Sequence, residues 1–112
     1  MDTLLKMKKN AEFKKVYTEG RYYVEKYVVM YIIKNSFDYN KVGYSVSKKI
    51  GKAVQRNLTK RRMREIYRTN ADGIKKGFDI VFTARAGSAQ AEFSDNQKCM
   101  ESAMFRARLL KK

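Results

Sequence analysis

The sequence of 112 residues contains no histidine and a single cysteine, Cys99. Histidine is the commonest general base near neutral pH and the commonest metal ligand, so its absence removes both roles. One cysteine can form neither an internal disulfide nor a cysteine-based zinc site. The eleven acidic residues are scattered, without an Asp-x-Asp or Asp-x-x-Glu pair that could hold a metal ion for hydrolysis. These absences predict no catalytic residue and no metal site in the protein, and they disfavour a nuclease that works through protein side chains alone.

Long apolar runs are also missing. No apolar stretch approaches the ~18 residues of a membrane-spanning helix. The N-terminus lacks the apolar region and the small-residue cleavage site of a signal peptide, so we expect a cytoplasmic protein. No repeat or interdomain linker is visible, and the length fits one domain over residues 1–112.

Positive charge is abundant. Lys and Arg outnumber Asp and Glu by 26 to 11, which gives a net charge of +15, while 44% of the residues are hydrophobic, as in a folded protein. Such an excess of one sign costs self-repulsion in the folded state, and a polyanionic partner is the usual compensation. Nucleic acid is the favoured partner, and an anionic membrane surface is the competing one.

The charge is concentrated in residues 52–68, which hold seven Lys or Arg and one acid, hence a net charge of +6. A basic turn containing Gly51 precedes a predicted helix over 53–69. At ~100° per residue, four cations spaced by four form one cationic stripe, with Asn57 and Arg61 beside it. Like charges at this spacing destabilise an isolated helix, so helix stability does not explain them. The stripe consists of Arg56, Lys60, Arg64 and Arg68, and the inward face is predicted to hold Leu58, Met63 and Ile66.

The remaining patterns predict a small sheet covered by helices. Asn10 and Gly20 are a good helix start and stop, so 11–19 is predicted as a helix after an extended lead-in at 3–9. Strands are predicted at 22–33, 41–47 and 78–84, the first two joined as a hairpin by a turn at 35–40. Capping-box spacing from Ser94 to Gln97 opens a last helix that reaches about Leu110. The order indicates an α+β or α/β fold, with a crossover over 41–84 that general rules make right-handed.

Three aromatic residues offer a second kind of binding chemistry. Phe13 and Tyr17 share one helix face with Val16, and Tyr31 lies in the first predicted strand. The helix face either packs on the core or exposes its rings, and unpaired bases stack on exposed rings with little sequence preference. Two classes of function remain open from the residues alone: an RNA-binding accessory subunit and a sequence-specific DNA-binding module. The second usually shows a helix-turn-helix pattern, whereas the basic helix here is bracketed by strands.

The run from Val42 to Asn57, continued by Lys60-Arg61 and Arg64, resembles the bacterial ribonuclease P protein component. The resemblance extends to residues 7–10, Phe13, Val16-Tyr17 and Gly20, to the strand that contains Tyr31, and to residues 79–85, and so covers essentially the whole chain. It implies a small α/β sandwich of the α+β class, with one sheet flanked by helices and a left-handed β-α-β crossover through the basic helix. The chain departs from the family at Leu58, which stands where the family has the last arginine of an Arg-Asn-Arg motif. It also departs at Gln55, Thr59 and Arg62, where the family is mostly apolar.

The resemblance also implies a function. The catalytic RNA of ribonuclease P removes the 5′ leader of precursor tRNA by magnesium-assisted hydrolysis, and the small protein binds both that RNA and the leader. Magnesium would be held mainly by the RNA, with none bound by the protein alone. The alternative is a general RNA- or DNA-binding accessory protein without a processing role. The leader-binding residues implied are Phe13, Tyr17 and Tyr31, and those implied to bind the catalytic RNA are Lys48, Lys49, Lys52, Arg56, Asn57, Lys60, Arg61, Arg64 and Arg68.

Overall fold

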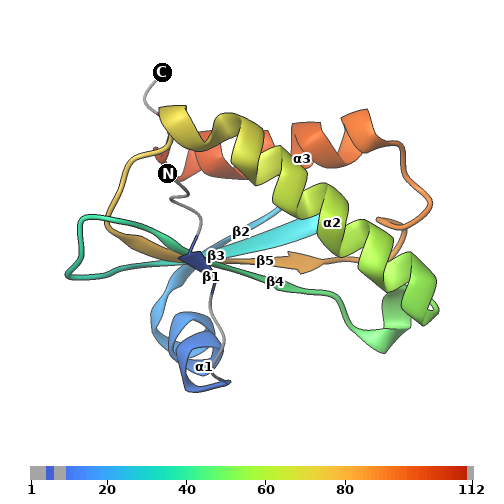
Figure 1. The fold of residues 1–112 in the computed structure, drawn as a ribbon, viewed down its shortest axis with the longest axis horizontal. Helices are drawn as coiled ribbons and strands as arrows, with labels where there is room; N and C mark the ends of the chain where they lie inside the picture. The colour runs from blue at the N-terminus through green and yellow to red at the C-terminus, as the bar shows by residue number, and fades with distance from the viewer. Residues whose placement is uncertain (1–4, 7–9, 111–112) are drawn as a thin grey trace.

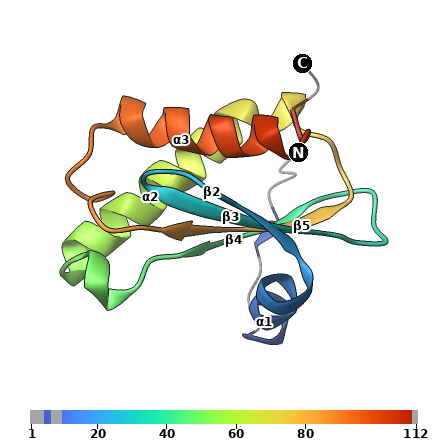
Figure 2. The ribbon, with the colours of Figure 1, turned by 180° about the vertical axis from the view of Figure 1, so that it is seen from behind.

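The computed structural model describes residues 5–6 and 10–110 and shows one five-stranded sheet with helices on both faces. Helix α1 covers one face, and helices α2 and α3 lie side by side on the other (Figure 1 and Figure 2). In chain order the elements are β1 (Leu5–Lys6), α1 (Asn10–Glu19), β2 (Arg21–Val24), β3 (Val28–Lys34), β4 (Lys41–Ser45), the 3-10 turn η1 (Lys48–Ile50), α2 (Ala53–Asn70), the 3-10 turn η2 (Ala71–Gly73), β5 (Phe78–Ala84) and α3 (Phe93–Arg106). The rest of the extended lead-in predicted at 3–9 lies outside the described residues.

The order of the strands in the sheet is β1-β4-β5-β3-β2, and it corrects two predictions. The hairpin between β3 and β4 is wrong, because β5 lies between them, antiparallel to β3 and parallel to β4. The single strand over 22–33 is also wrong. The chain turns at Glu25–Tyr27, where the N–H of Glu25 donates to the carbonyl of Val28, and β2 folds back antiparallel on β3. Glu25 and Lys26 are the polar interruption of an otherwise apolar and aromatic run.

Strands β4 and β5 are parallel and joined through α2. In Figure 1, α2 lies above the sheet, β4 and β5 both point to the right, and β5 lies behind β4. The crossover is therefore left-handed, as the family resemblance implies, and the right-handed expectation from general rules is wrong.

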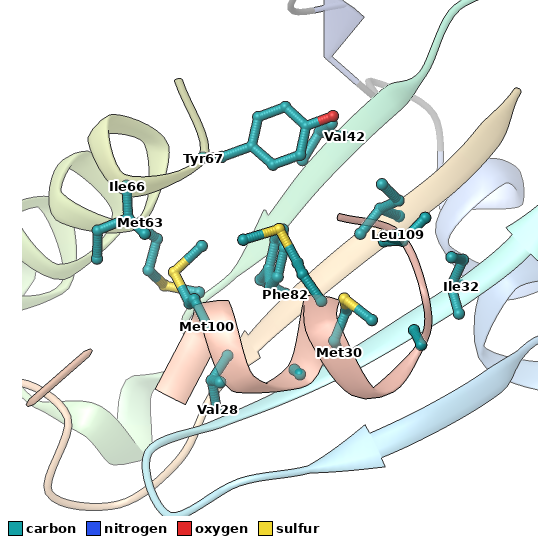
Figure 3. Packing of buried hydrophobic residues seen from close by; sticks show 14 of the residues in the cluster. Val28, Met30, Ile32, Val42, Met63, Ile66, Tyr67, Phe82, Met100 and Leu109 are labelled. Carbon is teal, nitrogen blue, oxygen red and sulfur yellow. The ribbon is translucent and has the colours of Figure 1, made fainter. Parts of the chain in front are cut away.

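The main core lies between the sheet and the α2–α3 layer. Alternate residues of β3 and β5 point into it, including Met30, Ile80 and Phe82, each with no exposed surface. Figure 3 shows Met30, Phe82 and Met100 gathered between the sheet and α3. On the other face Val16 of α1 and Val81 of β5 form a smaller buried cluster. Both faces of the central strands are therefore covered, as their apolar composition predicts.

Helix α3 begins at Phe93, with Glu92 at the capping position, and ends at Arg106, so the predicted Ser94 cap and the end near Leu110 are both displaced. The predicted apolar face of the helix is buried from Met100 to Met104. After the helix, Arg108 adopts a left-handed conformation with φ of 60°. This reversal turns the chain back, so that the buried Leu109 donates its N–H to the carbonyl of Met104 at 2.9 Å. Among the described residues, none of the helices is both long and apolar enough to cross a membrane.

Candidate nucleic-acid interface

The basic turn before α2 presents three lysines to solvent. Lys48 and Lys49 lie in η1 and Lys52 directly precedes α2, and all three are exposed. Ile50, in the middle of the turn, is buried in the core and anchors it. The side chain of Gln55 accepts a hydrogen bond from the N–H of Lys52 at 3.0 Å, which fixes the start of the helix. The three ammonium groups thus project from a firmly held segment.

Helix α2 packs on the sheet and α3 through Thr59, Met63, Ile66 and Tyr67. Thr59 is buried because its hydroxyl donates to the carbonyl of Gln55 at 2.9 Å and so stays satisfied. The buried residues of α2 are at positions 59, 63, 66 and 67, so the centre of its inward face lies away from position 58. The prediction that Leu58 points inward is therefore wrong, since that side chain is only half-buried.

The cationic stripe occupies one flank of α2. Arg56, Lys60 and Arg64 are half-exposed, and Arg64 lies over the ring of Tyr44 on β4 at 5.9 Å. The Nε of Arg64 is buried and has no hydrogen-bond partner among the described residues. Burial raises the pKa of the Tyr44 hydroxyl, so this neighbour stays neutral and leaves the guanidinium charge uncompensated. Uncompensated cations along one flank are suited to phosphate groups.

The end of the stripe differs from its middle. Arg68 forms an ion pair with Glu65 one turn earlier, with its Nη2 2.5 Å and its Nε 3.1 Å from the carboxylate oxygens. The hydrogen bond from Arg68 lowers the pKa of the Glu65 carboxyl, so the pair is ionised at neutral pH. Arg68 therefore offers less net charge to a partner than Arg64 does.

Tyr44 gives a testable pH dependence. The pKa of Tyr44 is higher in the folded protein than in the unfolded chain. The contribution of its neutral hydroxyl to the free energy of unfolding is therefore complete below the unfolded pKa of about 10, and it is lost as the pH rises above that value. We expect Tyr44→Phe to have the same free energy of unfolding as the parent protein at pH 7. At pH 11 its free energy of unfolding should be about 1.4 kcal/mol higher than that of the parent. Urea unfolding of both proteins at the two pH values measures the difference. An equal difference at both pH values would contradict it.

The three predicted leader-binding aromatics come together on the opposite face of the sheet. Tyr17 of α1 meets Tyr31 of β3 edge to face, with 4.7 Å between ring centroids, and Phe13 lies 6.4 Å from Tyr17. The hydroxyl groups of Tyr17 and Thr83 are 3.3 Å apart, which holds the Tyr17 ring beside the sheet. Phe13 is half-buried against Val16 and Val81, whereas Tyr17 keeps 37% of its surface exposed. The helix face thus packs on the core through Phe13 and exposes the ring of Tyr17. Each of the two alternatives left open by the sequence is correct for one of these residues.

Tyr22 belongs to the same surface, although the sequence analysis missed it. It pairs with Tyr31 across β2 and β3, its ring lies 5.9 Å from that of Tyr31, and it is 64% exposed. In an unbroken strand over 22–33, alternation would put Tyr22 on the face opposite to Tyr31. The turn at Glu25–Tyr27 reverses this, and the polar Glu25-Lys26 pair was the signal available in the sequence. Adjoining rings link Phe13, Tyr17, Tyr22 and Tyr31 into one cluster, to which we give the name aromatic groove.

At one end of β4 the chain passes directly from one surface to the other. Ser45, the last residue of that strand, pairs with Thr83 on the groove face, and Lys48 follows three residues later in the basic turn. Within the described part of the chain, no group of three Asp, Glu, Cys or His side chains could hold a metal ion. The arrangement offers phosphate contacts and ring stacking, which are the two elements of binding to RNA or DNA.

A mixed sheet with a cationic helix on one face and an aromatic groove on the other defines an α+β nucleic-acid-binding protein. The family model described as Ribonuclease P matches residues 1–108 of the chain. The chain therefore belongs to the ribonuclease P protein family, the protein part of a ribonucleoprotein endoribonuclease that processes tRNA.

Individual relatives agree with this assignment. The ribonuclease P protein component of Clostridioides difficile is 48% identical over 101 residues, which cover 89% of each chain. That of Thermoanaerobacter pseudethanolicus is 43% identical over 106 residues, 95% of this chain and 91% of that protein. Among solved structures, the Staphylococcus aureus RNase P protein superposes with a TM-score of 0.87 at 32% identity, covering 94% of this chain and 96% of that one. The Thermotoga maritima protein gives 0.83 at 32% identity, covering 90% and 96%.

Proposed function

We propose that this chain binds the catalytic RNA of ribonuclease P through α2 and the basic turn, and the 5′ leader of precursor tRNA in the aromatic groove. By holding both, it promotes endonucleolytic 5′-end maturation of tRNA. The observation that carries the proposal is the separation of two binding chemistries onto opposite faces of one sheet, with uncompensated cations on α2 and clustered rings beside α1.

The α2 surface suits a large folded RNA. Its cations lie along a straight helix of 18 residues, about 27 Å long, which can follow several successive phosphates. Contacts of this kind position the protein without reading sequence, as binding to an RNA of fixed shape requires. The residues proposed for this contact are Lys48, Lys49, Lys52, Arg56, Asn57, Lys60, Arg61, Arg64 and Arg68.

The aromatic groove suits a single strand. The rings of Tyr17, Tyr22 and Tyr31 are partly open to solvent and lie within 6 Å of a neighbouring ring in the groove, so unpaired bases can stack in succession. A leader is single-stranded, whereas the body of a tRNA presents mostly paired bases. The groove therefore distinguishes precursor from mature tRNA without needing a particular base sequence.

Magnesium belongs to the RNA side of this proposal. Hydrolysis is carried by the catalytic RNA with magnesium ions, in keeping with the lack of a metal-holding cluster of acids among the described residues of the protein. Its contribution is electrostatic, because phosphate charges neutralised by α2 no longer need counterions. The protein is therefore expected to lower the magnesium concentration at which cleavage proceeds.

Reconstitution tests the proposed function. The protein is added to a bacterial ribonuclease P RNA at low magnesium, and release of the 5′ leader from precursor tRNA is followed by gel. We expect cleavage with both components and none with either alone. Cleavage by the protein alone would assign the chemistry to its side chains, and no stimulation of the RNA would leave only general nucleic-acid binding.

Leu58 provides a test of which surface meets the catalytic RNA. It lies half-exposed beside Asn57, Lys60 and Arg61 in a shallow hollow of about 600 Å³ on α2. Leu58→Arg adds one cation there, so we expect several-fold tighter binding and a salt dependence steeper by about 0.9 in log–log slope. Filter binding over a salt series measures both. Leu58→Gln, which adds polarity without charge, should leave the slope unchanged, and equal slopes for Leu58→Arg and the parent would contradict the assignment.

A further inference from the structure

An exposed aromatic residue, Phe105, lies near the C-terminal end of α3. It keeps 64% of its surface exposed, whereas Met100, Ala103 and Met104 of the same helix are almost completely buried. The exposure of Phe105 places it on the outward side of the helix. Helix α3 lies across the sheet from α1 (Figure 1 and Figure 2). Among the described residues, Phe105 is neither in the main core nor one of the side chains packed against it.

Phe105 borders a hollow of about 490 Å³ built from two distant segments of the chain. The backbone N–H of Lys75 donates to the carbonyl of Leu109 at 2.8 Å, and Ile74 pairs with Leu110 in an isolated bridge. The left-handed turn at Arg108 brings the segment after α3 into this position. The hollow is lined by Lys75, Phe105, Arg106, Arg108 and Leu110.

The lining carries three cations and no acid. Arg106 is already engaged, because its Nη1 is 2.6 Å from a carboxylate oxygen of Glu25 and 3.0 Å from the carbonyl of Val24. Lys75 and Arg108 are exposed and form no salt bridge within the described residues. The sequence adds Lys76 beside Lys75. Cations near a helix C-terminus are favourable in themselves, but the helix dipole gives no reason for the exposed ring between them.

We infer that this surface, which we call the α3 surface, binds unpaired nucleotides of RNA at a second place, separate from the aromatic groove. A base stacks on Phe105 while Lys75 and Arg108 hold the flanking phosphates. A duplex would offer the cations its phosphates but would keep its base faces covered, and an acidic peptide would leave the ring unused. The inference rests on the proposed function in one respect only, namely that the polyanion bound at this surface is RNA.

The test uses the full chain carrying Phe13→Ala, Tyr17→Ala and Tyr22→Ala, so that three of the four rings of the aromatic groove are removed, and no catalytic RNA is present. Binding of a short fluorescein-labelled oligouridine is followed by anisotropy. Adding Phe105→Ala is expected to weaken binding about tenfold. Adding Arg108→Ala should lower the log–log salt slope by about 0.7. Phe93→Ala, a partly exposed phenylalanine at the other end of α3, is the matched control and should leave the affinity within about twofold.

Three results would overturn the inference. The first is that Phe105→Ala changes the affinity for oligouridine no more than Phe93→Ala does. The second is that Phe105→Ala weakens binding of an RNA duplex as much as binding of oligouridine. A polyglutamate peptide whose binding depends on Phe105 to the same degree would instead assign the surface to an acidic protein. Because Phe105 is exposed, circular dichroism is expected to show an unchanged fold. Failure of the reconstitution assay is a separate outcome, since it uses the unmodified chain and the catalytic RNA.

Discussion

Replacing Lys60 and Arg64 together with alanine is expected to weaken binding to the ribonuclease P RNA by roughly 50-fold at 0.1 M salt. Each phosphate contact releases counterions worth a log–log slope of about 0.9, so losing two should flatten the slope by about 1.8. Neither Lys60 nor Arg64 forms a salt bridge within the described residues, and Tyr44 beside Arg64 is held neutral by burial, so both charges are available to a phosphate. Filter binding with labelled RNA between low and high salt measures the affinity and the slope in one series.

The matched control removes the same charge elsewhere. Lys26→Ala with Lys98→Ala also lowers the net charge by two, at exposed positions in the β2–β3 turn and on α3. This pair should change the slope by little. Arg64→Ala also removes packing on Tyr44, so urea unfolding must show that the variant is folded under the binding conditions. Equal slopes for the two double variants would mean that overall charge, and not the α2 surface, determines binding.

Replacing Phe13 and Tyr17 together with alanine is expected to weaken binding of precursor tRNA by about 30-fold or more and to leave mature tRNA nearly unaffected. Stacking on one ring is worth about 1–3 kcal/mol per base, and Tyr17 also positions Tyr31 through their edge-to-face contact. Binding to the reconstituted holoenzyme, measured with matched precursor and mature tRNA, gives the ratio directly.

Two single variants separate stacking from folding. Tyr17→Phe keeps the ring and loses only the hydroxyl contact with Thr83, so it should retain most of the discrimination. Phe13→Ala alone should also cost stability, because Phe13 packs on the Val16–Val81 cluster. If precursor and mature tRNA lose affinity equally, or if only the free energy of unfolding falls, these residues are structural and the groove does not bind the leader.

The elements with strong local patterns could be predicted from the sequence. Helix α2 was expected over 53–69 and spans Ala53–Asn70, and β5 was expected and found at Phe78–Ala84. Their periodicity extends over many residues and needs no partner to be recognised. The hairpin failed because strand pairing is non-local: nothing near residues 35–40 shows that β5 will insert between the two strands. The handedness of the crossover followed from the family resemblance and not from general rules.

The candidate site was predicted in the same uneven way. The cations of α2 were found because they are contiguous in the sequence, and Phe13 and Tyr17 because they lie one turn apart. Tyr22 was missed because its face depends on a turn of three residues, and Phe105 because nothing local shows that a ring on a helix will stay outside the core. The ion pair of Arg68 with Glu65 fits helical spacing, yet only the structure shows that it forms.

The alternation along β3 makes this strand intolerant of any change in length. Met30 points into the main core and Tyr31 into the aromatic groove, one residue apart. Deleting or inserting a single residue between Val28 and Lys34 would exchange the two faces beyond that point, bringing tyrosine into the methionine core and methionine into the groove. The exposed tip of the following turn, residues 36–38, has no such alternation to preserve. Insertion scanning should therefore find a narrow segment where no length variant survives, directly beside one where several do.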